Sequence, residues 1–359
     1  MKNLTEIGWN DHFAALFESY SRNDLVPARV VKQYRERCLV AAEKGELKAD
    51  ISGRLRHSIA NISDFPVIGD WVAVESVGHG RGVIHAVLPR RSAFTRKAAG
   101  DLTEAQVVAA NVDTVFLITG LDGNFNLRRI ERYLTAARDS GASPVIVLNK
   151  ADLKLNLNET VAEVERIARG VPVVAVSAND GYNLDALGTF LAPGRTVAML
   201  GSSGVGKSTL INRLLGEERL RIRPVREDDS RGRHTTTHRE IVALPGGALL
   251  IDTPGMRELQ LWADDEGLDR SFDDIAGLAS RCRFADCRHE AEPACAVREA
   301  VERGSLDARR LENYLKQRRE LEFLALKQDE KARRRSEKAV GRKMAALMKE
   351  VKRRKPNYQ

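Results

Sequence analysis

Gly201-Ser202-Ser203-Gly204-Val205-Gly206-Lys207-Ser208 is the stretch of this 359-residue chain that decides its fold. Its glycines let backbone N–H groups converge on phosphate oxygens, Lys207 reaches the outer phosphates, and the Ser208 hydroxyl completes a Mg²⁺ shell. The apolar run 196–200 predicts a buried strand before the loop, and residues 208–215 have the apolar spacing of a helix after it. This context favours a phosphate-binding loop in an α/β domain over a plain strand-to-helix turn.

A second motif, Asn149-Lys150-Ala151-Asp152, is shorter, and by itself it is also typical of a polar turn that caps a helix. It follows the apolar run 144–148, which predicts a strand whose carboxyl end delivers the motif to the edge where α/β sheets bind ligands. The Asp152 carboxylate can accept both N1–H and the 2-amino group of guanine, which favours GTP over ATP. Ser177-Ala178, after a further apolar run, resembles the short base-contacting motif of GTPases.

Residues 248–251 are another apolar run, and it leads into Asp252-Thr253-Pro254-Gly255. At a strand end, the Asp252 carboxylate can hold a Mg²⁺-bound water, and the Gly255 N–H can donate to the terminal phosphate. The base-reading motif precedes the phosphate loop here, whereas in an ordinary small GTPase it follows. We therefore predict a circularly permuted P-loop GTPase domain whose site is intact in space.

Between the phosphate loop and Asp252, the segment from Arg221 to Thr237 is polar and charged, and it contains Arg231-Gly232-Arg233-His234-Thr235-Thr236-Thr237. One of its three threonines is expected to ligate Mg²⁺, in a loop that the terminal phosphate orders. Many GTPases carry a water-orienting glutamine where this chain has Met256, which cannot hold a water. Either a partner supplies that group or His234 does, because imidazole can orient water near neutral pH. A solvent-exposed loop histidine is the alternative.

Three of the four cysteines lie within fourteen residues, as Cys282-x4-Cys287-x-His289-x5-Cys295. Three thiolates and an imidazole can enclose a tetrahedral Zn²⁺ with four protein ligands, the pattern of a structural site. Buried cysteines that happen to be neighbours are the alternative. Cys38 is expected to be an unpaired thiol. No disulfide framework and no apolar amino-terminal segment are evident, so the sequence predicts a cytoplasmic protein.

The permuted order, the segment Gly232 to Thr237 and the cysteine cluster together resemble the RsgA (YjeQ) family, circularly permuted GTPases that depend on the small ribosomal subunit. The resemblance covers the chain from about residue 50 onward. It implies an N-terminal OB-type β-barrel, a central permuted GTPase domain and a C-terminal zinc-binding, mainly helical domain. It also favours Thr236 among the three threonines as the Mg²⁺ ligand.

The predicted domain boundaries combine this resemblance with local composition. Aromatic and apolar residues at helical spacing, among them Phe13 and Phe17, predict a helical extension at the amino end, with packing roles for these side chains. Short β-type runs separated by glycine predict the small barrel, with Trp71 and Phe65 expected in the core rather than stacked on RNA. The predicted units are residues 1–44 (helical extension), 45–97 (barrel), 98–262 (GTPase), 263–326 (zinc domain) and 327–359 (basic helix or tail).

The net charge of +8 is concentrated at the carboxyl end. Residues 327–359 carry 13 Lys and Arg against 4 Asp and Glu, so the other 326 residues are close to neutral. A segment with mostly positive charges and helix-favouring residues is suited to contact a phosphate backbone, and RNA is the expected partner. A solvated helix or a disordered end is the alternative.

The expected function is that of a monomeric GTP hydrolase that assists late assembly of the small ribosomal subunit, binds its rRNA and is stimulated by it. Two alternatives stay open: an RNA-binding module in which nucleotide only sets the conformation, and a GTPase that acts like a translation factor on working ribosomes. Candidate catalytic residues are Lys207, Thr236 and His234; Ser208 and Thr236 are the candidate Mg²⁺ ligands. The candidate GTP-binding residues are Asn149, Lys150, Ala151, Asp152, Ser177, Ala178, Gly201, Ser202, Ser203, Gly204, Val205, Gly206, Lys207, Ser208, Thr209, Asp252 and Gly255.

Overall fold

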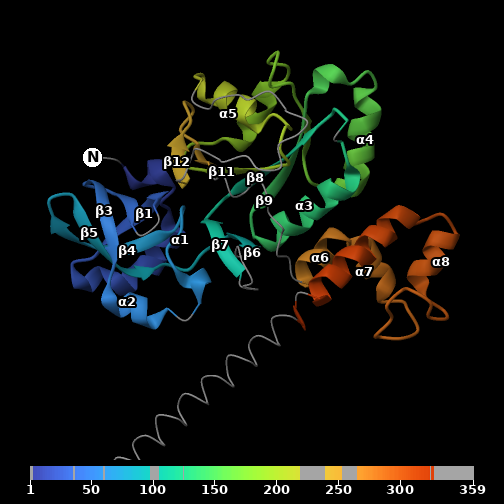
Figure 1. Ribbon diagram of the computed structural model, residues 1–359, viewed down its shortest axis with the longest axis horizontal. Coiled ribbons are helices and arrows are strands. Elements are labelled where there is room, and N and C mark those ends of the chain that lie inside the picture. Colours follow the sequence, from blue (N-terminus) through green and yellow to red (C-terminus); the bar gives the residue numbers. More distant parts are fainter. Residues whose placement is uncertain are drawn as a thin grey trace, which may run out of the picture.

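The computed structural model describes residues 3–34, 37–59, 61–97, 105–123, 125–218, 239–252, 265–323 and 325–326 (Figure 1). A β-barrel with a short helical extension lies at the amino end, an α/β unit occupies the centre, and a helical unit follows. Among the described helices, none combines the length and the apolar character that a membrane span needs.

The central unit is built on a mostly parallel sheet. Five strands run parallel and a sixth, β12, is antiparallel to its neighbour β13. In spatial order the strands are β10 (Val173–Ala175), β9 (Ser143–Asn149), β8 (Thr114–Gly120), β11 (Thr196–Leu200), β13 (Leu249–Asp252) and β12 (Arg239–Ala243). The strand that enters the phosphate loop, β11, lies between β8 and β13, so chain order and spatial order differ as a permuted domain requires.

Helices cover both faces of this sheet, which explains why its strands read as continuous apolar runs. Val115 and Leu117 of β8 pack with α3 (Leu127–Asp139) and α4 (Leu157–Ala168). Phe116 and Ile118 point to the other face and pack with α5 (Lys207–Leu215) and η5 (Leu184–Phe190). Alternate side chains of one strand therefore pack into the hydrophobic cores on opposite faces of the sheet.

The barrel contains five strands and closes because β1 pairs with both β2 and β4. Its strands are β1 (Val26–Gln33), β2 (Cys38–Ala42), β3 (Gly45–Ile51), β4 (Trp71–Gly78) and β5 (Arg81–Val87), with α2 (Gly53–Ser58) and η3 (Ile62–Asp64) between β3 and β4. Its core includes Val30, Val40, Val72 and Ile84, each without solvent exposure. The predicted small barrel is confirmed.

The prediction of helix up to residue 44 is wrong for residues 26–33 and 38–42, which form β1 and β2. The helical segments end earlier: η1 (Leu4–Ile7), α1 (Asp11–Phe17) and η2 (Glu18–Asn23). The packing roles expected for their aromatic residues are confirmed, since Phe13 and Phe17 are buried around the fully buried Trp71. The other predicted boundaries stay predictions.

The barrel is continuous with the central sheet. Lys32 and Gln33 of β1 pair with Glu240 and Arg239 of β12, so the two sheets form one eleven-stranded sheet. A separate two-stranded sheet, β6 (Ala93–Lys97) with β7 (Ala105–Ala110), lies where the chain passes from the barrel to the central unit.

The C-terminal unit is helical, as predicted. It contains α6 (Asp265–Ser271), α7 (Asp273–Ala279), α8 (Ala296–Glu302) and a helix over residues 308–323. Phe272, Ile275, Val297 and Tyr314 form its core together with Cys287 and Cys295. In Figure 1 this unit packs beside α3, and the barrel lies on the other side of the central unit. The basic segment 327–359 lies outside the described residues.

Candidate nucleotide site and metal centre

The predicted nucleotide-binding motifs follow the carboxyl ends of three parallel strands of one sheet. The Asn149 motif ends β9, Ser177-Ala178 follows β10, and the glycine-rich loop follows β11. Ligands of open α/β sheets bind at this edge, next to the point where strand order reverses. The structure therefore brings together three motifs that the sequence separates.

The phosphate loop depends on glycine at two positions. A Cβ on Gly201 would lie 2.4 Å from the Ile118 carbonyl oxygen, and a Cβ on Gly206 would lie 2.3 Å from Asn149 Nδ2. Gly206 also has a φ of +93°, in the left-handed region that disfavours other residues. Close packing against β8 and Asn149 thus fixes the path of the loop as it enters α5.

Lys207 lies inside this loop at the start of α5, and it is buried. Its Nζ donates hydrogen bonds of 2.6 Å to the carbonyl oxygens of Gly201 and Ser202. Two carbonyl groups of the loop therefore hold the ammonium group close to the backbone that would surround a phosphate. Ser208, the candidate Mg²⁺ ligand, is the next residue of the helix and is partly exposed.

Asn149 joins the motif predicted to read the base to the predicted phosphate loop. Its buried amide donates from Nδ2 to the Val205 carbonyl oxygen at 2.8 Å, and its Oδ1 accepts from the Ala178 N–H at 2.9 Å. One side chain thus fixes the phosphate loop and the Ser177-Ala178 loop relative to each other. Asp152, which is expected to read guanine, is exposed in η4 (Ala151–Leu153).

Two further residues act on these motifs and were not identified from the sequence. Asp122 accepts a 2.5 Å hydrogen bond from Lys150 Nζ, and Arg129 Nη1 donates to Ser202 Oγ at 3.1 Å. Asp122 follows β8, so its place at the carboxyl edge of the sheet was a usable signal. Arg129 lies in the first turn of α3, and no local pattern marks it.

Several predicted site residues fall outside the described part of the chain. His234, Thr236 and Gly255 belong to this group, as does Met256. For Asp252 the structure gives the backbone, which ends β13 opposite Glu240. Their roles stay predictions.

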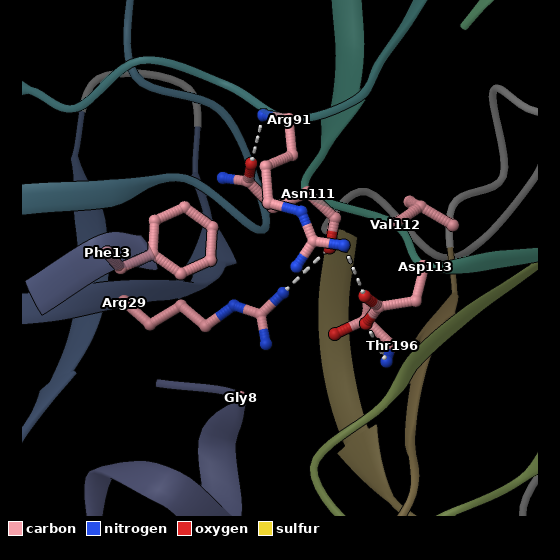
Figure 2. A pocket seen from close by; sticks show the side chains of 8 residues that line it. All are labelled: Gly8, Phe13, Arg29, Arg91, Asn111, Val112, Asp113 and Thr196. Carbon is pink, nitrogen blue, oxygen red and sulfur yellow. Dashed lines mark hydrogen bonds and ion pairs between the residues drawn. The ribbon is translucent and has the colours of Figure 1, made fainter. Parts of the chain in front are cut away.

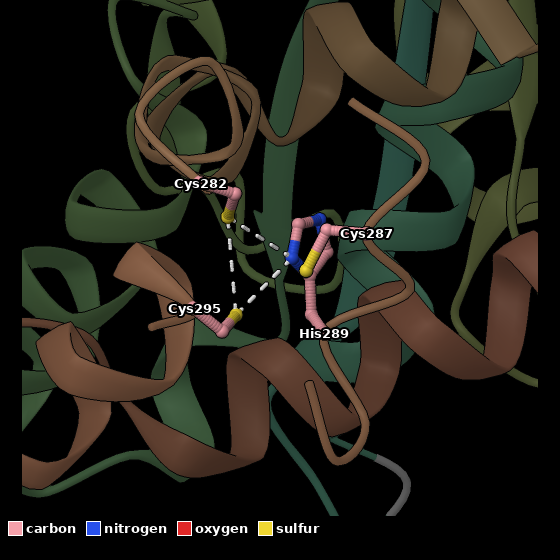
Figure 3. A group of neighbouring side chains, drawn as sticks. All are labelled: Cys282, Cys287, His289 and Cys295. Carbon is pink, nitrogen blue, oxygen red and sulfur yellow. Dashed lines mark hydrogen bonds between the residues drawn. The ribbon is translucent and has the colours of Figure 1, made fainter. Parts of the chain in front are cut away.

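The predicted metal ligands do converge. Cys282, Cys287, His289 and Cys295 each offer one ligand atom, and these four atoms lie within 4.8 Å of one another (Figure 3). His289 Nδ1 is 3.7 Å from Cys282 Sγ and 3.4 Å from Cys295 Sγ, and the two sulfur atoms are 3.9 Å apart. Zn–S bonds of about 2.3 Å in a tetrahedron give edges of about 3.8 Å. The cluster can hold a metal ion, and its dimensions fit zinc.

The electrostatics of the cluster differ from residue to residue. Burial raises the pKa of Cys287 to about 11, whereas backbone N–H groups outweigh burial and lower the pKa of Cys282. Burial, aided by the charge of Arg318, lowers the pKa of His289, which favours the neutral imidazole that a metal ligand requires. Cys38 is a buried thiol of the barrel, remote from this cluster in the fold.

Comparison with known proteins places these features in a family. The family model described as RsgA GTPase matches residues 87–262. A protein of Opitutus terrae named "Small ribosomal subunit biogenesis GTPase RsgA" is 53% identical over 336 residues, covering 91% of this chain and 92% of its own length. A protein of the same name from Syntrophotalea carbinolica is 45% identical over 335 residues, with coverage of 91% and 92%.

Solved structures agree with this assignment. YjeQ from Thermotoga maritima has a TM-score of 0.64 at 30% identity, covering 83% of this chain and 98% of its own. YloQ, described as a circularly permuted GTPase, has a TM-score of 0.61 at 22% identity, covering 84% of this chain and 96% of its own, and so supports the fold. The chain therefore belongs to the RsgA GTPase family.

Proposed function

We propose that this chain hydrolyses GTP while it assists biogenesis of the small ribosomal subunit. The observation that carries the proposal is the junction at Asn149, where the base-reading motif, the Ser177-Ala178 loop and the phosphate loop meet. The link to the small ribosomal subunit is supported by relatives named small ribosomal subunit biogenesis GTPase, which are up to 53% identical over nine-tenths of the chain.

Binding requires a local exchange of hydrogen bonds in the phosphate loop. Lys207 donates to two loop carbonyls, and phosphate oxygens would take their place as acceptors. The loop N–H groups from Gly204 to Thr209 would surround the phosphates, and Asn149 to Asp152 with Ser177-Ala178 would hold guanine. Mg²⁺, held by Ser208 and Thr236, would neutralise charge that develops on the phosphates.

Hydrolysis also requires a group that orients water. Met256 cannot do so, and we assign the role to His234, in a segment expected to be ordered by the terminal phosphate and the ribosomal subunit. Asp252 and Gly255 would contact the Mg²⁺-bound water and the terminal phosphate. His234→Ala should then lower turnover while leaving affinity for GDP unchanged, and equal turnover in the variant would exclude the role.

The metal centre has a structural role in this proposal. Cys282, Cys287, His289 and Cys295 would hold one Zn²⁺ with all four positions taken by protein, as structural sites do. The basic segment 327–359 would contact rRNA, and we propose a monomer acting in the cytoplasm.

The proposal is tested by comparing GTP turnover with isolated small subunits, with whole ribosomes and with neither. Stimulation by isolated small subunits supports it. Stimulation by whole ribosomes alone would favour a translation-factor role, and equal turnover in all three would favour an RNA-binding module that uses nucleotide only as a switch.

The base assignment has its own test. Asp152→Asn should lose GTP affinity by about 10⁴-fold and gain xanthosine triphosphate, because a site built on hydrogen bonds rejects a mispaired ligand strongly. Unchanged GTP affinity would remove Asp152 from the site.

A further inference from the structure

Arg213 links the helix of the phosphate loop to the loop that follows β10. It lies in the last turn of α5, the helix that begins at Lys207. Its Nε donates to the Ala178 carbonyl oxygen at 3.0 Å, and its Nη2 donates to the Asn179 carbonyl oxygen at 2.5 Å. The two donors of one guanidinium group therefore hold two successive carbonyls of this loop.

The same loop is held from its other side by Asn149. Asn149 Oδ1 accepts from the Ala178 N–H, while Arg213 binds the Ala178 carbonyl. Within the loop, the Gly181 N–H donates to the Ser177 carbonyl and the Ser177 N–H donates to the Tyr182 carbonyl. The loop thus has an internal turn, and Asn149 and Arg213 fix that turn to the rest of the site.

We propose that Arg213 is a positioning residue for the guanine-binding loop and that it slows the dissociation of nucleotide. The proposal rests on the proposed function, because it takes Ser177-Ala178 as part of the base site. A base that leaves the site must pass this loop. A loop that is held less firmly opens more often, so nucleotide should dissociate faster. Charged donors make stronger hydrogen bonds than neutral ones, which suits an arginine to this task even at an exposed position.

Comparing the dissociation rates of GDP and GTP should show whether Arg213 acts on the base or on the phosphates. GDP and GTP share the guanine base, so loss of Arg213 should raise both dissociation rates by the same factor. That factor is about 3- to 10-fold, from the usual net contribution of a hydrogen bond. Association rates should stay as in the unaltered protein.

The experiment uses the full chain and three variants. Arg213→Met keeps the length of the side chain without its donors, and Arg213→Lys keeps the charge without the paired donors. Arg166→Met is the control, since Arg166 is an exposed arginine in the last turn of α4 with no hydrogen bond from its side chain in the described part of the chain. Dissociation of fluorescent GDP and of a fluorescent non-hydrolysable GTP analogue is measured by displacement.

We expect equal acceleration for both nucleotides in Arg213→Met, a smaller one in Arg213→Lys and none in Arg166→Met. Hydrogen exchange at the amides of residues 178–180 should also be faster in Arg213→Met, even without nucleotide. Unchanged dissociation in Arg213→Met overturns the proposal, and so does acceleration confined to one nucleotide. If the unaltered protein binds neither nucleotide, the proposed function itself fails, and this inference with it.

Discussion

The barrel and the C-terminal helical unit are attached to the central unit by different chemistry. On the barrel side, the fully buried Arg29 donates to three backbone carbonyls, those of Ile7, Gly69 and Asn111. These belong to the helical extension, the barrel and the chain leading into β8. Figure 2 shows Arg29 reaching toward Asn111 beside Phe13 and Gly8. On the C-terminal side, a buried ion pair is central.

Burial disfavours the charged form of Arg29 at the barrel junction. It lowers the pKa of Arg29 to about 10, although the charges of Asp113 and Asp70 oppose the shift. Asp70 in turn accepts two 2.8 Å hydrogen bonds from Arg90, which also donates to the Ser63 and Phe65 carbonyls. Arg90 is therefore part of the folded junction.

The C-terminal junction is centred on Arg310. Its guanidinium pairs with Glu131 of α3 at 2.6 Å and with Asp274 of α7 at 2.7 Å, and it lies 4.7 Å from the Phe272 ring centroid. Asn313 donates to the second oxygen of Glu131. Exposed pairs, such as Arg128 with Glu312 and Arg132 with Glu320, surround this group. We therefore expect the barrel, which pairs with the central sheet through its backbone, to behave as one body with the centre, and the C-terminal unit to separate more readily.

Loss of the proposed zinc ion should unfold the C-terminal unit alone, and it has the largest expected effect. Structural zinc contributes about 10–16 kcal/mol to small zinc-binding units, so chelation or Cys287→Ser should unfold residues 265–323. The barrel and the nucleotide site should survive, with GDP affinity close to that of the unaltered protein. Elemental analysis and circular dichroism provide the readout.

The control for that change is Cys38→Ser. Cys38 is also buried, and burial raises its pKa to about 11, but it lies in the barrel core. We expect one Zn²⁺ per chain in this variant. Undenatured protein without bound metal, or loss of metal in Cys38→Ser, would contradict the assignment.

Arg310→Met should undock the C-terminal unit without unfolding it. The change leaves the buried carboxylate of Glu131 without its cation, which costs about 3–5 kcal/mol. Limited proteolysis between the two units measures the docking. Arg128→Met removes an exposed pair of the same junction and should cost less than about 1 kcal/mol. Equal losses in the two variants would mean that burial does not set the strength of this junction.

Arg29→Met should lower the stability of the whole amino-terminal part by about 2–4 kcal/mol, because three buried carbonyls lose their donor. Since barrel and centre share one sheet, we expect a single unfolding transition at a lower temperature in calorimetry. Arg56→Met, at an exposed position in the last turn of α2, is the control. A separate early transition for the barrel would show that the two parts are not one body.

Ionic strength should affect the two junctions differently, and this is the smallest of the expected effects. Raising ionic strength from about 0.1 M to 1 M shortens the screening length from about 10 Å to 3 Å. The exposed pairs around Arg310 should weaken, so proteolysis at the C-terminal junction should increase by a few-fold while the barrel junction stays unchanged. Equal responses of the two junctions would remove the distinction.

The sequence predicted those parts of the fold in which one local signal decides the outcome. Parallel strands buried on both faces appear as apolar runs, and their carboxyl ends carry the motifs, so the Asn149 and Gly201 segments could be placed at one edge. Cys282 to Cys295 were recognisable because ligand types cluster within a short segment.

Other parts depended on contacts between distant segments. In β1 the apolar pattern is interrupted by Arg29 and Lys32, so the barrel was predicted to start too late. In the sequence, Arg29 cannot be distinguished from a surface arginine, because its three carbonyl acceptors belong to distant segments. The pairing of Arg310 with Glu131 joins residues 179 positions apart, and nothing near either residue indicates it.

The pairing of β1 with β12 also bears on how the chain folds as it is made. Lys32 leaves the ribosome long before its partner Glu240. At about 5–20 residues per second, the outer edge of β1 waits on the order of ten seconds or more for its last neighbour. Such an edge can pair with another chain, and contacts between distant segments slow folding. Synthesis that pauses between β5 and β12 should therefore increase aggregation of the nascent protein.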